Sequence, residues 1–168
     1  MPDVVEHSER VVRFAIATAK ELNVNASQIQ LLERAARFHD IGKLAMPEAV
    51  LTKPSPLTPG EVTIMRGHVD TGAEILMSTA TLRSTVPIVK ASHEWFGGKG
   101  YPDGIAGQAI PLASRMIAVA DAYDAMTQDR HYRTRLGAVE AISELLRGAP
   151  SQFDPDVVVA FLNIVNRH

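Results

Sequence analysis

Apolar residues recur every three or four positions along most of this 168-residue chain, a spacing that gives an α-helix one apolar face. The first such stripe runs from Val4 to Leu22, and the helix that carries it should end near Asn23. No segment shows the apolar–polar alternation of a half-buried β-strand. We therefore expect an all-α fold, a compact bundle of about six to eight helices of ordinary length.

Helix-end signals divide the chain further. Asn25, with Gln28 three residues later, is typical of a helix start, and Gly42 is the expected end of that helix. The next helix begins with a capping box that has proline at the first helical position, formed by Thr58, Pro59 and Glu61. This helix should run to about residue 76 or 77. Further helices are expected over 85–96, from about 111, over 138–146 and from Asp154 onward, with an irregular glycine-rich stretch at 97–107.

The composition is that of a globular protein. With 46% hydrophobic and 21% charged residues the chain can bury a core, and we expect one domain over residues 1–168. A net charge of -2 leaves no excess of positive charge to attract duplex nucleic acid or an acidic membrane surface. The absence of cysteine excludes disulfides, cysteine-ligated zinc and a thiol nucleophile. Uncharged stretches such as Gly104–Ser114 are too short to span a membrane, and the start MPDVVEHSER is unlike a signal peptide, so we expect a cytoplasmic protein.

Four histidines fall on the predicted helices, and each lies near an acidic residue: His7, His39, His68 and His93. Asp121 and Asp124 lie three residues apart on one face of a predicted helix. Imidazole and carboxylate without thiolate form the ligand set of hydrolytic Fe, Mn, Ni or Zn centres, and a carboxylate such as Asp40 can bridge two ions. Taken singly these residues say little, because a lone helical histidine is more often a core or surface residue. The aspartate pair is equally compatible with a solvated helix face.

Several short motifs follow one another in a fixed order: His39-Asp40-Ile41-Gly42-Lys43, His68, His93-Glu94, GKGYPDG at 98–104, and Asp121. The segments HSERV at 7–11, DRHYR at 129–133 and QFDP at 152–155 extend the pattern over nearly the whole chain. Together the motifs resemble the HD-GYP family, the branch of the HD metal-dependent phosphohydrolases that degrades bacterial cyclic di-GMP. The resemblance implies an HD-type helical bundle with a glycine-rich GYP loop.

The resemblance also implies a set of ligands for two divalent metal ions: His7, His39, Asp40, His68, His93 and Asp121, with Asp3 where some family members have a further acidic ligand. Fe or Mn is favoured, with Ni, Mg or Zn as alternatives. Asp40 and Lys43 are implied in catalysis, and the implied substrate-binding residues are Lys43, Tyr101, Arg130 and Arg133. The implied partner is cyclic di-GMP, and GGDEF, receiver or sensory domains commonly accompany the family.

Two positions depart from the family pattern HHExxDGxGYP, which this chain reads as SHEWFGGKGYP. Ser92 replaces the first histidine, and serine is a poorer ligand than imidazole for these metals. Gly97 replaces an aspartate that would orient the loop or a ligand. We therefore expect no more than two bound ions.

The expected reaction is metal-dependent hydrolysis of cyclic di-GMP to linear pGpG, with a second cleavage to GMP as an option. In this mechanism Asp40 bridges the two ions, and Lys43 helps to stabilise the charge that develops on the phosphoryl oxygens. Two alternatives stay open. One is a degenerate domain, suggested by Ser92 and Gly97, that binds cyclic di-GMP or a partner protein with little or no turnover. The other is an HD phosphohydrolase that acts on another nucleotide.

Overall fold

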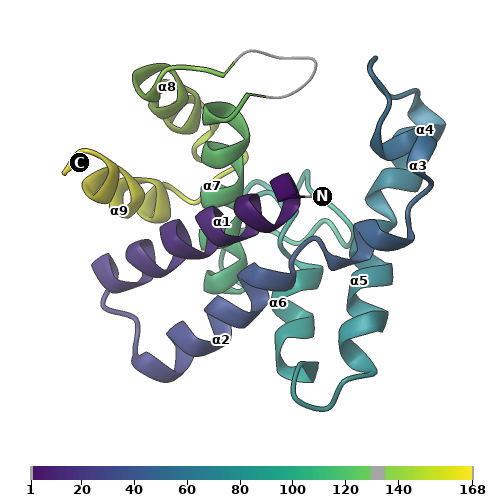
Figure 1. Ribbon diagram of the computed structural model, residues 1–168. Coiled ribbons are helices and arrows are strands. Elements are labelled where there is room, and N and C mark those ends of the chain that lie inside the picture. The colour runs from purple at the N-terminus through teal and green to yellow at the C-terminus, as the bar shows by residue number, and fades with distance from the viewer. Residues whose placement is uncertain (1, 130–134, 168) are drawn as a thin grey trace.

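The computed structural model describes residues 2–129 and 135–167, with side chains from residue 5 onward in these ranges. Within them the fold is all-helical, which confirms the expected fold class (Figure 1). The α-helices are α1 (Pro2–Glu21), α2 (Ala26–Phe38), α3 (Glu48–Leu51), α4 (Pro59–Arg66), α5 (His68–Met77), α6 (Val86–Lys90), α7 (Leu112–Thr127), α8 (Ala138–Gly148) and α9 (Pro155–Val165). Short 3-10 helices lie at Ile41–Ala45 (η1), Arg83–Thr85 (η2) and Gly107–Ala109 (η3).

Helix α1 lies at the centre of the bundle, where it packs against α2, α7 and α9 (Figure 1). Its buried face consists of small and β-branched side chains, all but Thr18 on the predicted stripe: Val11, Val12, Ala15, Thr18 and Ala19. Phe161 of α9 is fully buried and contacts the rings of Phe14 and Tyr123, which belong to α1 and α7. This core fixes the positions of α1 and α7, the two helices that carry His7 and Asp121.

Three predicted helix starts are confirmed by their caps. The side chain of Asn25 accepts a hydrogen bond from the backbone N–H of Gln28 at 3.0 Å. Thr58 and Glu61 form a capping box at the start of α4, and Asp154 caps α9. Each cap pairs backbone N–H groups that the first turn of a helix leaves free, so these starts are determined by local sequence.

The helix predicted over 59–77 is divided at Gly67 into α4 and α5. The N–H of Gly67 donates to the carbonyl of Ile64 at 3.0 Å, a 3-10 contact that tightens the last turn of α4. Helix α5 then begins at His68. The apolar spacing continues across the break, which is why the sequence predicts one helix.

The helix predicted over 85–96 ends at Lys90, so His93 lies in a turn and not on a helix. The backbone N–H groups of Ser92 and Glu94 each donate to the carbonyl three residues earlier, at 3.1 Å. These tight turns end the helix before the glycine-rich loop and direct the chain toward the centre of the bundle.

Gly42 does not end α2, which stops at Phe38. It lies in η1, which packs against α5. A Cβ at this position would lie 1.8 Å from the carbonyl oxygen of His68 and 2.6 Å from the backbone nitrogen of Gly72. Only glycine permits this approach, which places the segment that follows His39 beside the start of α5.

Helices α3 and α4 form an arm at one edge of the molecule, away from α8 and α9 (Figure 1). They contact each other, and α4 also contacts α5. Among the described residues no helix combines the length and the apolar character that a membrane span needs.

Candidate metal centre

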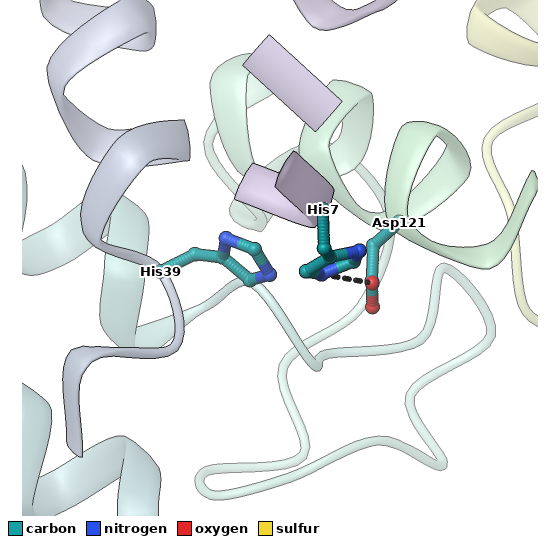
Figure 2. A group of neighbouring side chains, drawn as sticks. All are labelled: His7, His39 and Asp121. Atoms are coloured by element: carbon teal, nitrogen blue, oxygen red, sulfur yellow. Dashed lines mark ion pairs between the residues drawn. The ribbon is translucent and has the colours of Figure 1, made fainter. Parts of the chain in front are cut away.

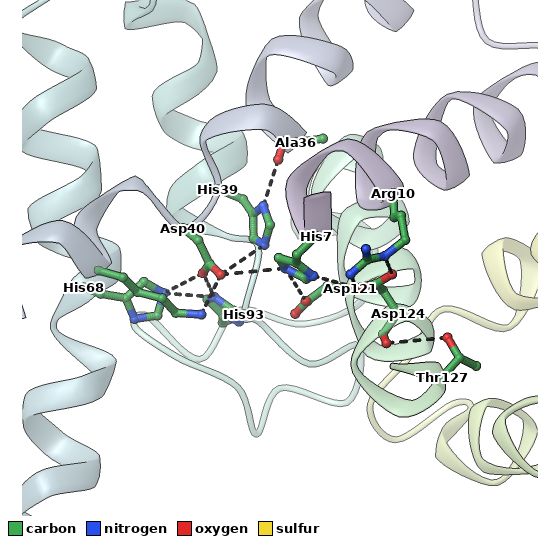
Figure 3. A network of polar contacts seen from close by, with 11 residues as sticks. His7, Arg10, Ala36, His39, Asp40, His68, His93, Asp121, Asp124 and Thr127 are labelled. Atoms are coloured by element: carbon green, nitrogen blue, oxygen red, sulfur yellow. Dashed lines mark hydrogen bonds and ion pairs between the residues drawn. The ribbon is translucent and has the colours of Figure 1, made fainter. Parts of the chain in front are cut away.

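The implied metal ligands whose side chains are described meet at one place in the bundle (Figure 3). They form two groups, in each of which the ligand atoms lie within 4.8 Å of one another: His7, His39 and Asp121, shown in Figure 2, and Asp40, His68 and His93. They come from α1, the end of α2, the start of α5, the turn after α6, and α7. The side chain of Asp3 lies outside the described side chains, and Arg130 and Arg133 lie outside the described residues.

The carboxylate of Asp40 belongs to the second group, and its other oxygen faces the histidines of the first group (Figure 3). Its Oδ2 is 3.5 Å from Nε2 of His39 and 4.0 Å from Nε2 of His7. Its Oδ1 is 3.4 Å from Nε2 of His68 and 3.8 Å from Nε2 of His93. A carboxylate placed in this way can bridge two metal ions about 3.5–4 Å apart.

Three of the histidines are oriented by a contact to their outer ring nitrogen. Nδ1 of His39 and Nδ1 of His68 each donate to the backbone carbonyl three residues earlier, at 2.8 and 2.6 Å. Nδ1 of His7 lies 2.7 Å from Oδ2 of Asp124. A neutral imidazole that donates from Nδ1 presents the lone pair of Nε2 to the centre, which is the usual arrangement of a metal-ligating histidine.

Two of the inner atoms have no hydrogen-bond partner among the described residues. Nε2 of His39 and Oδ1 of Asp40 are buried, and no described residue forms a hydrogen bond to either atom. Leaving a buried polar atom unpaired costs about 1–3 kcal/mol. A divalent cation would pair with both atoms, so the residues present fit a metal centre with nitrogen and oxygen ligands.

Asp40 is held in its ionised form. Burial on its own raises the pKa of Asp40, but the neighbouring His39, His68, His93 and Lys43 outweigh burial and hold this pKa well below its usual value. The ammonium of Lys43 donates to Oδ2 of Asp40 at 2.5 Å. The two residues implied in catalysis are therefore in direct contact at the edge of the ligand groups.

Asp124 lies at the site, in contact with His7, although the sequence left open whether it faces solvent. Its side chain is buried, and in addition to His7 it accepts hydrogen bonds from Nε of Arg10 at 2.5 Å and Nη2 of Arg10 at 3.2 Å. Burial raises the pKa of Asp124, while the hydrogen bonds from His7 and Arg10 lower it more, so the carboxylate stays ionised. The sequence signal for Asp124 is its i, i+3 spacing from Asp121, which puts both side chains on one face of α7. Asp121 lies 3.4 Å from Nε2 of His7, and Asp124 contacts Nδ1 of the same ring.

Tyr101 of the glycine-rich loop covers one of the ligand groups. Its ring lies parallel to the imidazole of His93, with the ring centroids 5.2 Å apart and an interplanar angle of 8°. The guanidinium carbon of Arg66, at the end of α4, lies 4.9 Å from the centroid of the same ring. Burial and the charge of Asp40 raise the pKa of Tyr101 to about 12, so its hydroxyl stays protonated.

A cavity of about 270 Å³ opens beside the ligand groups and reaches both of them, through His93 and Asp121. Tyr101 lines it, together with the aromatic side chains of Trp95 and Phe153. Ligand pockets of this kind combine apolar and aromatic walls with a few polar groups. Aromatic side chains beside a polar centre suit the flat ring of a nucleobase.

Each of the two positions that depart from the family pattern donates a hydrogen bond to a backbone carbonyl. Ser92 lines the cavity, but its hydroxyl donates to the carbonyl of Val89 at 2.8 Å and belongs to neither ligand group. At Gly97 a Cβ would lie 2.8 Å from the carbonyl oxygen of Ser151, so a larger residue does not fit this backbone. The N–H of Gly97 donates to that same oxygen at 2.9 Å and ties the loop to residue 151.

The family model described as "HD domain" matches residues 1–157. The chain belongs to the HD domain family. This match agrees with the paired histidine and aspartate groups at the centre of an all-helical fold, and it confirms the recognition made from the sequence motifs.

Two curated relatives cover most of the chain. The cyclic di-GMP phosphodiesterase response regulator RpfG of Xanthomonas campestris is 36% identical over 156 residues, which is 92% of this chain and 41% of that protein. The 3'3'-cGAMP-specific phosphodiesterase 3 of Vibrio cholerae is 32% identical over 165 residues, which is 98% of this chain and 36% of that protein. The chain therefore spans less than half the length of either relative.

Among solved structures, the HDG"Y"P protein Bd1817 of Bdellovibrio bacteriovorus has a TM-score of 0.78 and 19% sequence identity. The similarity covers 97% of this chain and 52% of that chain. At this level of identity the likeness shows the fold.

Proposed function

We propose that the chain hydrolyses a phosphodiester bond of cyclic di-GMP to give linear pGpG, with GMP as the product of a second cleavage. The observation that carries this proposal is the position of Asp40, whose two oxygens face two separate groups of ligand atoms. The relatives support the substrate class, because their names assign them to cyclic di-GMP and 3'3'-cGAMP. The sequence motifs favour cyclic di-GMP within that class.

We propose that two divalent ions are held by His7, His39 and Asp121 on one side and by His68 and His93 on the other, with Asp40 shared. Asp3 is proposed as a further ligand. Fe or Mn is preferred for this set of imidazole and carboxylate ligands, with Ni, Mg or Zn as alternatives. When bound, such ions lower the pKa of a water molecule to near neutrality and polarise a phosphoryl oxygen.

The chain's own residues supply binding and charge. In the hydrolysis the oxygen of water bonds to phosphorus and the bond to the 3′ oxygen breaks. One proton of the water passes to the 3′ oxygen, and the other is released from the new phosphate group to solvent. The ammonium of Lys43, which is partly exposed beside Asp40, pairs with the charge that develops on the phosphoryl oxygens. Tyr101 provides an aromatic face at the cavity, and Arg130 and Arg133 are proposed to hold phosphate or guanine through paired N–H groups.

The test combines metal analysis with chromatography of products. The anaerobically purified chain should contain metal and convert cyclic di-GMP to pGpG. A variant with His39→Ala and Asp40→Ala should lose both metal and turnover while remaining helical by circular dichroism, and Asp70→Asn, at an exposed site on α5, is the matched control. A double variant that keeps its metal would contradict the assignment of the ligands.

The two alternatives are outcomes of the same experiment. A metal-loaded chain that binds cyclic di-GMP in a single-turnover assay but releases no pGpG is a binding module. A chain that cleaves 3'3'-cGAMP and leaves cyclic di-GMP intact acts on another nucleotide. The single domain over residues 1–168, the association with GGDEF, receiver or sensory domains and the cytoplasmic location are also proposals, which rest on the sequence.

A further inference from the structure

Glu94 is a buried carboxylate that belongs to neither ligand group, although it follows His93 directly. Only 3% of its surface is exposed. Its Oε1 accepts hydrogen bonds from the backbone N–H groups of Asp103 and Gly104, at 2.7 and 2.9 Å. Burying a carboxylate costs free energy unless it accepts hydrogen bonds. Here Oε1 accepts both of its hydrogen bonds from two neighbouring backbone N–H groups.

The hydrogen bonds of Glu94 close the loop that contains Tyr101. At Gly100 a Cβ would lie 2.4 Å from Cα of Glu94 and 2.2 Å from the backbone nitrogen of Trp95, so the loop lies directly against the chain segment that follows His93. The N–H of Tyr101 donates to the carbonyl of His93 at 3.2 Å. The turn that begins at Tyr101 is thus held at its start by this bond and at its end by the carboxylate of Glu94.

We propose that Glu94 is a positioning residue for substrate binding: its carboxylate holds the turn at 101–104 so that the ring of Tyr101 lies over His93 at the edge of the cavity. This inference rests on the proposed function, in which a cyclic dinucleotide contacts Tyr101. Glu94 acts through two backbone N–H groups and needs no contact with the substrate.

Substitutions at Glu94 separate the hydrogen bonds from the volume of the side chain. Oε2 is buried and has no hydrogen-bond partner among the described residues, so Glu94→Gln can put its amide nitrogen there and keep a carbonyl oxygen for both N–H groups. Glu94→Ala removes the acceptor. The matched control is Glu140→Ala, because Oε2 of Glu140 accepts from the backbone N–H of Gly137 at 3.0 Å, at the exposed start of α8.

The first measurement is amide hydrogen exchange, resolved by NMR, on the 168-residue chain without substrate. In Glu94→Ala the amides of Asp103 and Gly104 should exchange at least about 10-fold faster than in the parent, because each loses its acceptor. In Glu94→Gln they should stay within about 3-fold of the parent, and Glu140→Ala should leave them unchanged. Parental protection in Glu94→Ala would overturn the proposal.

The second measurement is a double-mutant cycle with Tyr101→Ala, read as KM for cyclic di-GMP. Glu94→Ala should raise KM about 10-fold, with metal content unchanged and kcat within about 3-fold. Adding Tyr101→Ala should raise KM little further, because both substitutions remove the same contact, and Glu94→Gln should restore most of the affinity. Additive effects on KM would mean that Glu94 does not act through Tyr101.

The two measurements also separate this proposal from the proposed function. A parent chain without turnover contradicts the function, while hydrogen exchange still decides whether Glu94 holds the turn, and Kd for cyclic di-GMP then replaces KM in the cycle. If Glu94→Ala does not fold, Glu94→Asp, which withdraws the carboxylate by one methylene, carries the same tests.

Discussion

Replacing Asp124 by Asn should weaken metal binding without removing any ligand that contacts a metal. Asp124 accepts from Nδ1 of His7 and from two nitrogens of Arg10, whereas an asparagine has one acceptor oxygen and places an N–H₂ group against a donor. At least one charge-assisted hydrogen bond is lost, which costs about 1.5–3 kcal/mol. Loss of the partner that orients a ligating histidine lowers metal affinity by about 10- to 100-fold, or about 1.4–2.7 kcal/mol. The two magnitudes agree.

The assay is a competition titration of the metal against a chromophoric chelator, with metal per chain measured after dialysis. We expect Asp124→Asn to bind one ion about 10- to 100-fold more weakly and the other nearly as the parent does, because Asp124 contacts only the group that contains His7. Asp70→Asn controls for the loss of a charge near the site, since Asp70 is exposed and two residues from His68. Parental affinity for both ions in Asp124→Asn would refute the argument that Asp124 orients His7.

Three further predictions test other features of the chain. Gly42→Ala should lower the free energy of unfolding by about 3 kcal/mol or more, because the new Cβ would overlap the carbonyl of His68. Gly60→Ala, with open space around it, should change this free energy little. Equal stabilities of the two variants would contradict the close approach at Gly42. Ser92→His should raise metal per chain and the rate of pGpG formation together, and three tightly bound ions in the parent would show that the serine costs no ligand. Hydrogen bonds from Lys53 and the backbone of Thr58 lower the pKa of Glu61 to about 2. The carboxylate of Glu61 therefore stabilises the fold fully above the ordinary carboxylate pKa, and this stabilisation is lost as the pH falls toward 2. In unfolding titrations the stability difference between the parent and Glu61→Gln should shrink between about pH 5 and pH 2, and a constant difference would contradict this argument.

The parts of the fold that the sequence predicts are those that local chemistry determines. The cap at Asn25 is confirmed because its hydrogen bond joins residues three apart. The apolar stripe of α1 is confirmed because four of its residues are buried in the core: Val11, Val12, Ala15 and Ala19. The break at Gly67 and the turn at His93 were not predicted. At both places the backbone donates to the carbonyl three residues earlier, a tightening of the chain that the apolar spacing of the sequence does not reveal.

The candidate site also contains residues that the sequence predicts and residues that only the fold reveals. Motif order was enough to name the proposed ligand residues, because each is a chemically distinctive side chain at a fixed place in the pattern. The residues that hold those ligands in place were less visible, since Asp124 and Glu94 are ordinary acidic residues until the fold shows what they bind. Burial identifies them, and burial is a property of the packed chain.

The placement of Asp40 makes the two halves of the proposed centre thermodynamically dependent on each other. A single carboxylate offers one oxygen to each group, so an ion on one side fixes the orientation of the carboxylate for the other side and also withdraws electron density from it. The free energy of this coupling is reciprocal: whatever factor the first ion applies to the affinity for the second, the second applies to the first. The two ions should therefore not bind independently. If orientation dominates, scarce metal divides the population between empty and doubly loaded chains; if charge withdrawal dominates, singly loaded chains are enriched.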